Sequence, residues 1–522
     1  MKKTALLLLV LVFVLSPAVG AQKIFNYGIE SGPTSLDPAI LYGNNSIQLA
    51  QNLFDGLTSI NDNLDIIPSI AKDWTASDDG LTYTFYLRED VYFTNGDQVT
   101  AEDFKYSWNR ALDPELGNPH LFMMDLIKGA RSVIAGETTE AEGLVVKDEF
   151  VFEVTLEYPA GHFLSLSSSF PYWVVNKNVI EEYGDDWTRP GNIVGTGAFI
   201  LTEAVMDNYF VFEANKDYFK GAPDIDVARA HIIPEATIRM MKYEAGELDA
   251  IISLTPADLM RIKADDSLSE QFGSISGLAT RWLGIRTTKE PFDDIRVRQA
   301  FAMAIDRERL VQIALNNMGQ AAYTFLPIGM PGYNPDLRPY DFNPEKAQQL
   351  LEEAGFPLGS GFPAVKIYFD STDEMQRVWQ FVQSEIRRNL GIVNIGLESL
   401  PWRGYVTVRN NPDTRPALFR NGMGADYPDP QEFLEYFGVS DSFHNFEEYN
   451  DPRFDQLIYQ ANRTLDFDER MELFGQAEAM YLESAALIPL YHPLSTWMQK
   501  PHVDGFGYSP LYLKPLHSVT LK

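Results

Sequence analysis

Segments with strand periodicity and segments with helix periodicity alternate along almost the whole chain, which limits the fold to the mixed α/β classes. Residues 81–87 carry a large apolar side chain at every second position, which predicts a half-buried strand. Thr100, with Asp103 three residues later, predicts the start of a helix over residues 101–111. The Asp-Pro dipeptide at residues 113–114 predicts the end of this helix.

The same alternation continues toward the C-terminus. Residues 210–214 repeat the strand pattern, and residues 296–316 are predicted to form one long helix. Asn343 is expected to cap a helix that Gly355 ends. Two further helices are predicted over residues 375–390 and 467–482. The apolar face of the 296–316 helix consists of Val297, Ala300, Phe301, Ala304 and Ile305.

The length of the chain predicts more than one folding unit. Its 522 residues are too many for one ordinary hydrophobic core, so we expect at least two lobes. Hydrophobic residues make up 45% and aromatic residues 13% of the chain, which is typical of a globular protein and not of a disordered one.

The first 21 residues have the features of a secretory signal peptide. Lys2 and Lys3 precede an apolar run over residues 6–15, and small residues occupy positions 19–21. The alternative is a membrane anchor, but an apolar run of about 10 residues is short for a spanning helix, which needs about 20. We therefore expect cleavage after Ala21 and a soluble exported chain.

Cysteine is absent, which excludes disulfides, thiolate metal sites and a lipid-modified N-terminal cysteine. An exported protein without a lipid anchor stays near its cell only behind an outer barrier. We therefore expect the periplasm, with full secretion as the alternative that the sequence leaves open.

The negative charge of the chain argues against anionic partners. The formal net charge is −31, and removing Lys2 and Lys3 leaves 40 basic and 73 acidic residues, or −33. Such a surface repels nucleic acid and anionic lipid headgroups, so we expect neither as a partner.

Motifs for catalysis or cofactor binding are not found. The seven histidines are scattered, with no H-E-x-x-H pattern, and there is no phosphate-binding or dinucleotide-binding glycine motif. Residues 273–277 resemble a nucleophile elbow only superficially, because Ile275 stands at the nucleophile position. We expect no enzyme activity, no metal and no cofactor. A pair of carboxylates of the glycosidase type cannot be identified from spacing, so an exported hydrolase stays open as a remote alternative.

Short motifs in a fixed order cover nearly the whole chain after residue 21. They are residues 35–38 (SLDP), 51–57 (QNLFDGL), 79–85 (DGLTYTF), 94–96 (TNG), 100–108 (TAEDFKYSW), 195–199 (GTGAF), 291–300 (PFDDIRVRQA), 304–307 (AIDR), 343–347 (NPEKA), 425–430 (ADYPDP) and 488–491 (IPLY). In this order they resemble the peptide-binding family of ABC importer solute-binding proteins, the oligopeptide- and dipeptide-binding group.

The resemblance implies an α/β, two-lobed periplasmic-binding-protein fold of the class II type, with an extra inserted domain and the ligand enclosed between the lobes. It also implies a monomer that captures short peptides and passes them to the membrane permease subunits of an ABC importer. The implied division is a signal peptide over 1–21, lobe I over 22–54, 187–278 and 499–522, the inserted domain over 55–186, and lobe II over 279–498.

Asp426 is the leading candidate for a binding residue. It matches the family segment whose aspartate binds the α-ammonium group of the peptide, and its alternative role is to cap the turn before Pro428. Gly422 and Gly424 match a segment that offers its backbone to the ligand by β-strand addition, although glycines of this kind also occur in ordinary turns.

Other candidates are also implied by the resemblance. Arg420 and Arg409 align with arginines that meet the C-terminal carboxylate of the peptide, a role that suits the guanidinium fork. The remaining candidates are Trp402 beside a side-chain pocket, Asn44 through its main chain, and, more weakly, Trp282 and His120, near which the family often has tyrosine. For the arginines the alternative is an ordinary surface position, and for Trp402 it is core packing.

Relatives in this family also bind dipeptides, nickel complexes, haem, murein peptides or sugars, so another solute is the main alternative. The aspartate at position 426 favours peptides, because the sugar-binding relatives do not need an acidic residue there.

Overall fold

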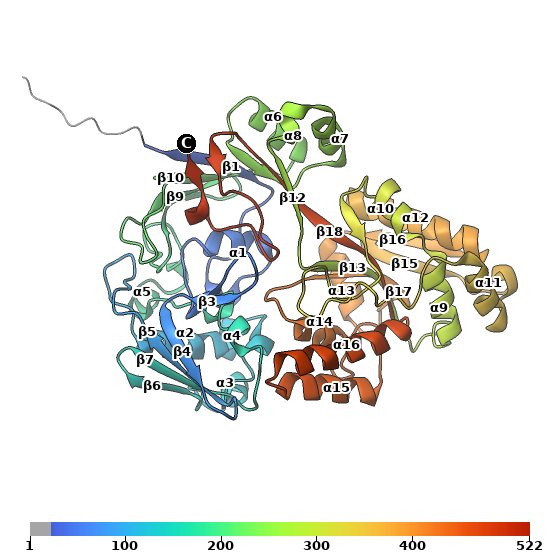
Figure 1. Cartoon of the computed structure of the whole chain (residues 1–522), viewed down its shortest axis with the longest axis horizontal. Coiled ribbons are helices and arrows are strands. Elements are labelled where there is room, and N and C mark those ends of the chain that lie inside the picture. Colours follow the sequence, from blue (N-terminus) through green and yellow to red (C-terminus); the bar gives the residue numbers. More distant parts are fainter. Residues whose placement is uncertain (1–21) are drawn as a thin grey trace, which may run out of the picture.

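One twisted sheet of twelve strands runs through the protein (Figure 1). The structure is a computed structural model that describes residues 22–522, so the predicted signal peptide lies outside the described residues. The strand order is β16-β15-β17-β13-β18-β11-β1-β10-β9-β8, with β12 and β14 both pairing with β18. The strands are β1 (Ile24–Ile29), β8 (Phe199–Val205), β9 (Tyr209–Ala214), β10 (Val227–Ile232), β11 (Ala250–Ile252), β12 (Phe272–Ser276), β13 (Ala279–Ile285), β14 (Gly319–Ala321), β15 (Val365–Asp370), β16 (Ile395–Leu400), β17 (Leu418–Gly424) and β18 (Leu487–Gln499).

The long strand β18 joins two lobes. Its first half pairs with β13 and β14, and its second half pairs with β12 and β11. Figure 1 shows the result as two bodies side by side, with β18 crossing between them. We call the body that contains β13 to β17 and the first half of β18 the second lobe. The exact domain boundaries stay a prediction.

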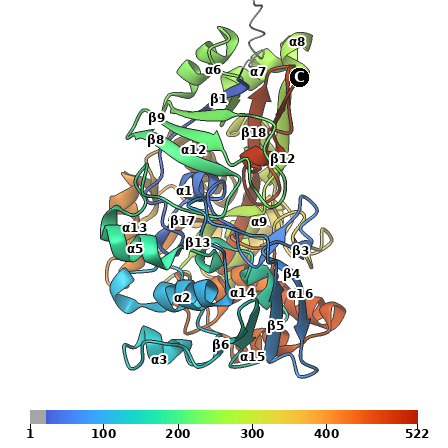
Figure 2. The same ribbon diagram turned by 90° about the vertical axis from the view of Figure 1, so that its left-hand side faces the viewer.

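A smaller antiparallel sheet lies in the other body, in the order β4-β5-β7-β6 (Figure 2). Its strands are β4 (Ala71–Ala76), β5 (Thr82–Leu87), β6 (Leu144–Asp148) and β7 (Val151–Thr155). Buried side chains between residues 57 and 174 form a core of their own, and Tyr427 of the second lobe also packs into it. Two-stranded sheets are formed by β2 (Thr58–Ile60) with β3 (Ile66–Pro68) and by β19 (Val503–Asp504) with β20 (Thr520–Leu521).

Helices cover both faces of the second-lobe sheet, as separate buried clusters of apolar side chains on its two sides indicate. The helices of the second lobe are α9 (Ile295–Ala304), α10 (Arg307–Ile313), α11 (Pro344–Glu353), α12 (Asp373–Leu390), α13 (Trp402–Asn410), α14 (Pro430–Gly438), α15 (Pro452–Arg463) and α16 (Phe467–Glu483). Those of the other body are α1 (Asn44–Ala50), α2 (Ala101–Leu112), α3 (Ala130–Ile134), α4 (Phe163–Leu166), α5 (Lys177–Tyr183), α6 (Ala236–Glu244), α7 (Pro256–Ala264) and α8 (Asp266–Ser269). In residues 22–522 no helix has the length and apolar character needed to cross a membrane.

Most of the predicted elements are confirmed, because local side chains fix their ends. The strand β5 buries alternate residues as predicted. Helix α2 starts at a capping box in which the Thr100 backbone donates to Asp103 at 2.8 Å. Helix α11 is capped by Asn343, and α12 ends at Gly391 with φ +72°.

The single helix predicted over residues 296–316 is wrong. The chain forms α9 and α10 instead, and Ile305 between them is extended at φ −105° and ψ 114°. The break arises at Asp306, whose side chain accepts a hydrogen bond from the Arg309 amide at 3.0 Å and so caps a new helix. The predicted apolar face is nevertheless buried throughout.

Candidate ligand-binding site

The strand β17 has one edge that is paired only at its beginning. On that side β15 pairs with Leu418 and Phe419 alone, and its last two residues, Phe369 and Asp370, have no partner in β17. Residues 420–424 therefore have a neighbouring strand, β13, on one side only. We call residues 420–424 the open edge. It lies beyond the carboxyl end of β15, which is the position where open α/β sheets bind ligands.

The direction of the backbone groups along the open edge follows from two hydrogen bonds between β17 and β13. The amide of Ala425 donates to Leu278 at 2.8 Å, and the amide of Arg286 donates to Ala417 at 2.9 Å. Residues in an antiparallel pair alternate between bonded and non-bonded positions. Arg420, Gly422 and Gly424 therefore turn their N–H and C=O groups away from β13 and toward the open side.

Two of these backbone groups already have hydrogen-bond partners within the protein. The hydroxyl of Tyr405 on α13 donates to the Arg420 carbonyl, and the Gly422 amide donates to the side-chain oxygen of Asn421 at 3.0 Å. The Gly422 carbonyl and both backbone groups of Gly424 still face the open side. An extended chain placed there can pair with them as an added strand.

The two glycines of the open edge lack side chains for different reasons. A Cβ at Gly422 would lie 2.5 Å from Cδ of Arg281, so the absence of a side chain there leaves room for that arginine. A Cβ at Gly424 would approach only Cβ of Ala279, at an ordinary 3.8 Å. Nothing in the described protein therefore requires glycine at position 424, and the missing side chain leaves space for a ligand on that face of the sheet.

Asp426 lies two residues after the end of the open edge and is partly buried. Its carboxylate accepts a hydrogen bond from the Tyr512 hydroxyl at 3.1 Å. Within residues 22–522 no basic side chain lies within 4 Å of this carboxylate. Burial raises the pKa of Asp426, and the hydrogen bond from Tyr512 lowers it only in part. A cationic group would therefore be favoured beside Asp426.

The capping role considered for Asp426 belongs to another aspartate. The side chain of Asp429 accepts the Gln431 amide at 2.9 Å and caps α14. The Asp426 amide itself donates to the buried Glu432 carboxylate at 3.0 Å. Because Glu432 belongs to α14, this bond ties the turn after β17 to that helix and so fixes the backbone position of Asp426.

His120 approaches Asp426 from the other body. Its Nε2 lies 2.9 Å from the Leu41 carbonyl, and its Nδ1 has no hydrogen-bond partner among residues 22–522. Burial lowers the pKa of His120, and the charge of Asp426 raises it in part. The structure thus brings together His120, Asp426 and Tyr512 from three distant segments. In the same described residues no cluster of three or more His, Asp or Glu side chains could hold a metal ion.

Arg420 and Arg409 lie at the other end of the open edge. The Nε of Arg420 is 3.1 Å from Oδ1 of Asp370, and its guanidinium carbon is 5.3 Å from the ring centre of Trp402. Trp402 is 48% exposed, so its ring has a free surface. Arg409 donates to the Asn421 side chain at 3.1 Å. The positions 420 to 426 span about 20 Å of extended chain.

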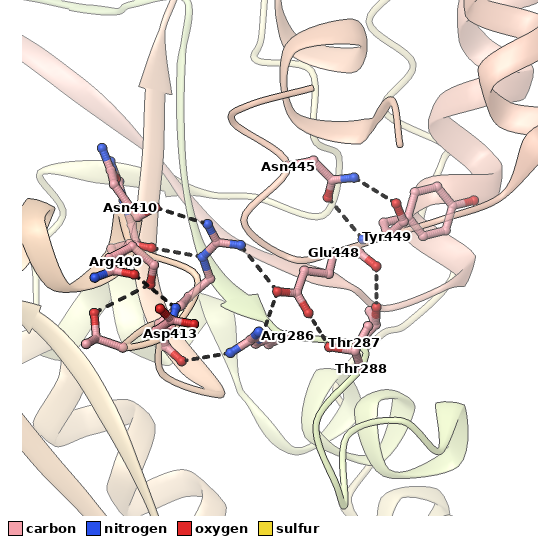
Figure 3. Close-up of polar contacts among 12 residues, drawn as sticks. Arg286, Thr287, Thr288, Arg409, Asn410, Asp413, Asn445, Glu448 and Tyr449 are labelled. Atoms are coloured by element: carbon pink, nitrogen blue, oxygen red, sulfur yellow. Dashed lines mark hydrogen bonds and ion pairs between the residues drawn. The ribbon is translucent and has the colours of Figure 1, made fainter. Parts of the chain in front are cut away.

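A polar network holds the end of α13, where Arg409 lies (Figure 3). Arg415 donates to the Arg409 carbonyl at 2.9 Å and forms an ion pair with Glu448 at 3.4 Å. Glu448 also pairs with Arg286 at 2.7 Å, directly after β13. The segment that carries Arg409 is therefore tied to the strand that pairs with the open edge.

Comparison with known proteins identifies the family of the chain. Residues 65–445 match the model of the bacterial extracellular solute-binding proteins, family 5. The chain belongs to this family. It is 31% identical over 499 residues to the periplasmic oligopeptide-binding protein OppA of Salmonella typhimurium, covering 93% of this chain and 90% of the relative. It is 30% identical over 508 residues to the dipeptide-binding protein DppE of Bacillus subtilis, covering 94% and 90%.

Solved structures of family 5 proteins share the fold over nearly the full length. The unliganded open form of the murein tripeptide-binding protein MppA matches with a TM-score of 0.81 at 28% identity, covering 96% of this chain and 98% of MppA. The Haemophilus influenzae OppA complex with the peptide RPPGFSPFR matches with a TM-score of 0.80 at 26% identity, covering 96% and 99%. These matches show the two-lobed α/β fold that the sequence predicted.

Two predicted residues of this family 5 protein lie away from the open edge. Trp282 is fully buried, its indole donates to Glu447 at 2.9 Å, and its ring packs against Phe325 and Phe437. Asn44 is the exposed first residue of α1, three positions after Leu41, whose carbonyl meets His120. Asn44 is thus on the Asp426 side of the site, whereas Trp282 is part of the core.

Three residues around the site were not found from the sequence. Tyr512 lies 86 positions from Asp426, and no local pattern indicates that they meet. Tyr405 follows Trp402 by three positions, so helical spacing could have indicated it. Arg281 is the polar residue in an apolar strand, and its register opposite Gly422 could be inferred only after β13 and β17 were paired.

A buried ion pair of the second lobe also contacts the other body. Arg470 on α16 donates twice to Asp429, at 2.6 and 2.7 Å. The same guanidinium lies 3.3 Å from Nδ1 of His162, which belongs to the other body. His162 is therefore held as a neutral acceptor at the contact between the bodies, because a proton on Nδ1 would face the Arg470 charge.

This contact predicts a pH effect on stability. Burial lowers the pKa of His162 from 6.5 to about 4, although the charge of Asp429 raises it in part. Below pH 6.5 the unfolded chain binds a proton that the folded chain does not, so stability falls with decreasing pH. Between pH 7.5 and 5.0 we expect the wild type to lose about 2 kcal/mol more than the His162→Gln variant.

Denaturant unfolding of both proteins at the two pH values measures this difference. The glutamine variant keeps a hydrogen-bond acceptor and loses the titrating group, so any constant cost of the substitution cancels. Identical pH dependence in the two proteins would show that His162 is not held neutral at the contact.

Proposed function

We propose that this chain captures short peptides outside the cytoplasmic membrane and delivers them to an ABC importer. The observation that carries the proposal is the open edge of β17 with the partly buried Asp426 two residues beyond it. A peptide offers the three features that such a site can bind, which are an ammonium group, a repeating amide backbone and a carboxylate. The relatives named for oligopeptides and dipeptides support the same substrate class.

Each end of the ligand would have its own partner. The α-ammonium group would form a charge-assisted hydrogen bond with Asp426. The ligand backbone would pair with Gly422 and Gly424 as an added strand. The C-terminal carboxylate would meet Arg409 or Arg420, depending on the length of the peptide. A span of about 20 Å corresponds to five or six extended residues, which sets the scale of the ligand.

Side chains of the ligand would need room rather than specific contacts. A cavity of about 290 Å³ lies between the two bodies, close to Asp426 through Tyr427 and Glu432. Its wall includes Phe122, Tyr158 and Tyr436. Water in such a cavity could bridge differing side chains to the protein without new direct contacts.

The remaining parts of the proposal concern the protein's place and partners. We propose that it is exported by a cleaved signal peptide over residues 1–21, carries no lipid anchor and works as a periplasmic monomer. We also propose lobe I over 22–54, 187–278 and 499–522, an inserted domain over 55–186 and lobe II over 279–498. The lobes would close around the peptide by a hinge motion, and the closed form would dock on the permease subunits.

Identification of the bound ligand tests the proposal. The protein is purified without denaturation, and native mass spectrometry records the masses that leave it on dissociation. We expect a spread of short peptides. A single sugar, a haem or a metal chelate as the bound species would contradict the proposal.

Gly424 offers a test of the added strand. A Gly424→Ala variant should fold with unchanged thermal stability, because the new methyl group meets only Ala279 at 3.8 Å. It should weaken peptide binding about tenfold, because the methyl group would occupy space on the face of the sheet beside the bound peptide. Calorimetric titration measures the affinity, and Gly404→Ala on the exposed side of α13 is the control. Unchanged affinity would remove Gly424 from the site.

A further inference from the structure

Arg281 is a basic residue on β13, beside the open edge, and no acidic side chain of residues 22–522 forms an ion pair with it. It lies on β13 opposite Gly422, and its side chain crosses the face of that glycine, with Cδ, Nε and Nη1 all within 3.2 Å of the place of a Cβ. The Nη1 atom donates to the carbonyls of Met423 at 3.1 Å and Thr280 at 3.3 Å. Within residues 22–522 no carboxylate lies within 4 Å of this guanidinium.

The two carboxylates near Arg281, Asp370 and Glu374, both already accept hydrogen bonds or ion pairs from other side chains. Arg420, the next basic residue on the same face of the sheet, already pairs with Asp370 at 3.1 Å. The carboxylate of Glu374 accepts the Tyr491 hydroxyl at 2.7 Å. Burial lowers the pKa of Arg281, and the charge of Arg420 lowers it further. A further carboxylate beside Arg281 would offset both effects.

We propose that Arg281 binds a carboxylate of the ligand and so determines which peptides this protein prefers. The proposal rests on the proposed peptide-binding function. A guanidinium that donates only to main-chain carbonyls still has N–H groups that can donate to a carboxylate. Hydrogen bonds between two charged groups are stronger than those between neutral groups.

The distance along β17 places this carboxylate within the ligand. In the proposed pairing the first residue of the peptide lies beside Gly424, where its α-ammonium group reaches the Asp426 side chain. Gly422 is two positions further along β17, or about 7 Å of extended chain, so the third or fourth residue of the peptide lies beside Arg281. The carboxylate is therefore either the C-terminus of a tripeptide or the side chain of an acidic residue at the third or fourth position of a longer peptide.

Calorimetric titration with matched peptides distinguishes these two sources. The first pair of peptides is Ala-Ala-Glu-Ala-Ala and Ala-Ala-Gln-Ala-Ala. The second pair has the same glutamate or glutamine at position four instead of position three. The third pair is Ala-Ala-Ala and its C-terminal amide. The proteins are the wild type, Arg281→Met, Arg281→Lys and the control Arg453→Met. Arg453 is exposed and pairs with its neighbour Asp451.

We expect the wild type and the control to prefer the acidic member of at least one pair by tenfold or more. Arg281→Met should lose that preference and keep its affinity for the Ala-Ala-Gln-Ala-Ala peptide, while Arg281→Lys should retain part of the preference. A preference confined to the pentapeptides identifies a side chain, and one confined to the tripeptide identifies the C-terminus.

Two other results are decisive against the proposal. If the ratio of the affinities for the acidic and the neutral peptide is the same in the wild type and in Arg281→Met, the proposed role of Arg281 is wrong, while peptide binding itself is unaffected. Binding of none of these peptides to the wild type would overturn this proposal together with the proposed function.

Discussion

Replacing Asp426 by asparagine should weaken the binding of a short peptide by about 100-fold or more. The substitution removes the negative charge that would meet the α-ammonium group and leaves that ammonium desolvated without a counter-charge, which costs about 3–5 kcal/mol in buried pairs. Asparagine keeps the size of the side chain and an oxygen for the Tyr512 hydroxyl. Calorimetric titration of a tripeptide measures the change.

The same variant should not lose stability in the absence of ligand. Burial raises the pKa of Asp426, so the charged carboxylate is itself held unfavourably in the free protein. Asp413→Asn, at an exposed position after α13, is the control and should bind the peptide like the wild type. A loss of affinity together with a lower melting temperature would indicate a structural role for Asp426 and count against its contact with the ligand.

Replacing Arg470 by methionine should lower the free energy of unfolding by about 3–5 kcal/mol. The Arg470 side chain is 3% exposed and that of Asp429 is 7% exposed, so the variant leaves an uncompensated buried carboxylate. The substitution should also affect the ligand-binding site, because Asp429 caps α14, and Glu432 on α14 accepts the hydrogen bond from the Asp426 amide. Denaturant unfolding at pH 7.5 measures the loss.

Two further variants test the origin of this loss. The double variant Asp429→Asn with Arg470→Met removes both charges and should recover a large part of the stability. Arg453→Met breaks an ion pair whose arginine is 80% exposed, and it should cost under about 1 kcal/mol. Similar losses for Arg470→Met and Arg453→Met would contradict the importance assigned to the buried pair.

The fold was predictable from the sequence where local chemistry decides it. Thr100 and Asp103 mark the start of α2 within a few residues of chain, and Gly391 ends α12 in the left-handed conformation that glycine favours. The break between α9 and α10 was missed because the apolar face continues through Ile305. One aspartate side chain, Asp306, outweighs that continuity by capping the second helix.

The site was predictable only in part, for a similar reason. Asp426 could be found because its whole segment resembles the family motif. Its hydrogen bond with Tyr512 and its charge effect on His120 depend on how distant segments come together, and no local pattern encodes an interaction between residues so far apart in the chain. Likewise, the open edge exists because β15 pairs with only the first two residues of β17, a fact of strand pairing that residue types alone do not reveal.

The most direct test of peptide capture at Asp426 compares one tripeptide with a free amino terminus and the same tripeptide after N-acetylation, each titrated into the wild-type protein by calorimetry. Acetylation removes the ammonium group and leaves the backbone and the C-terminus unchanged. We predict that the free tripeptide binds and that the acetylated one binds about 100-fold more weakly or not at all. Equal affinity for the two would contradict the binding of the ligand through its α-ammonium group at Asp426.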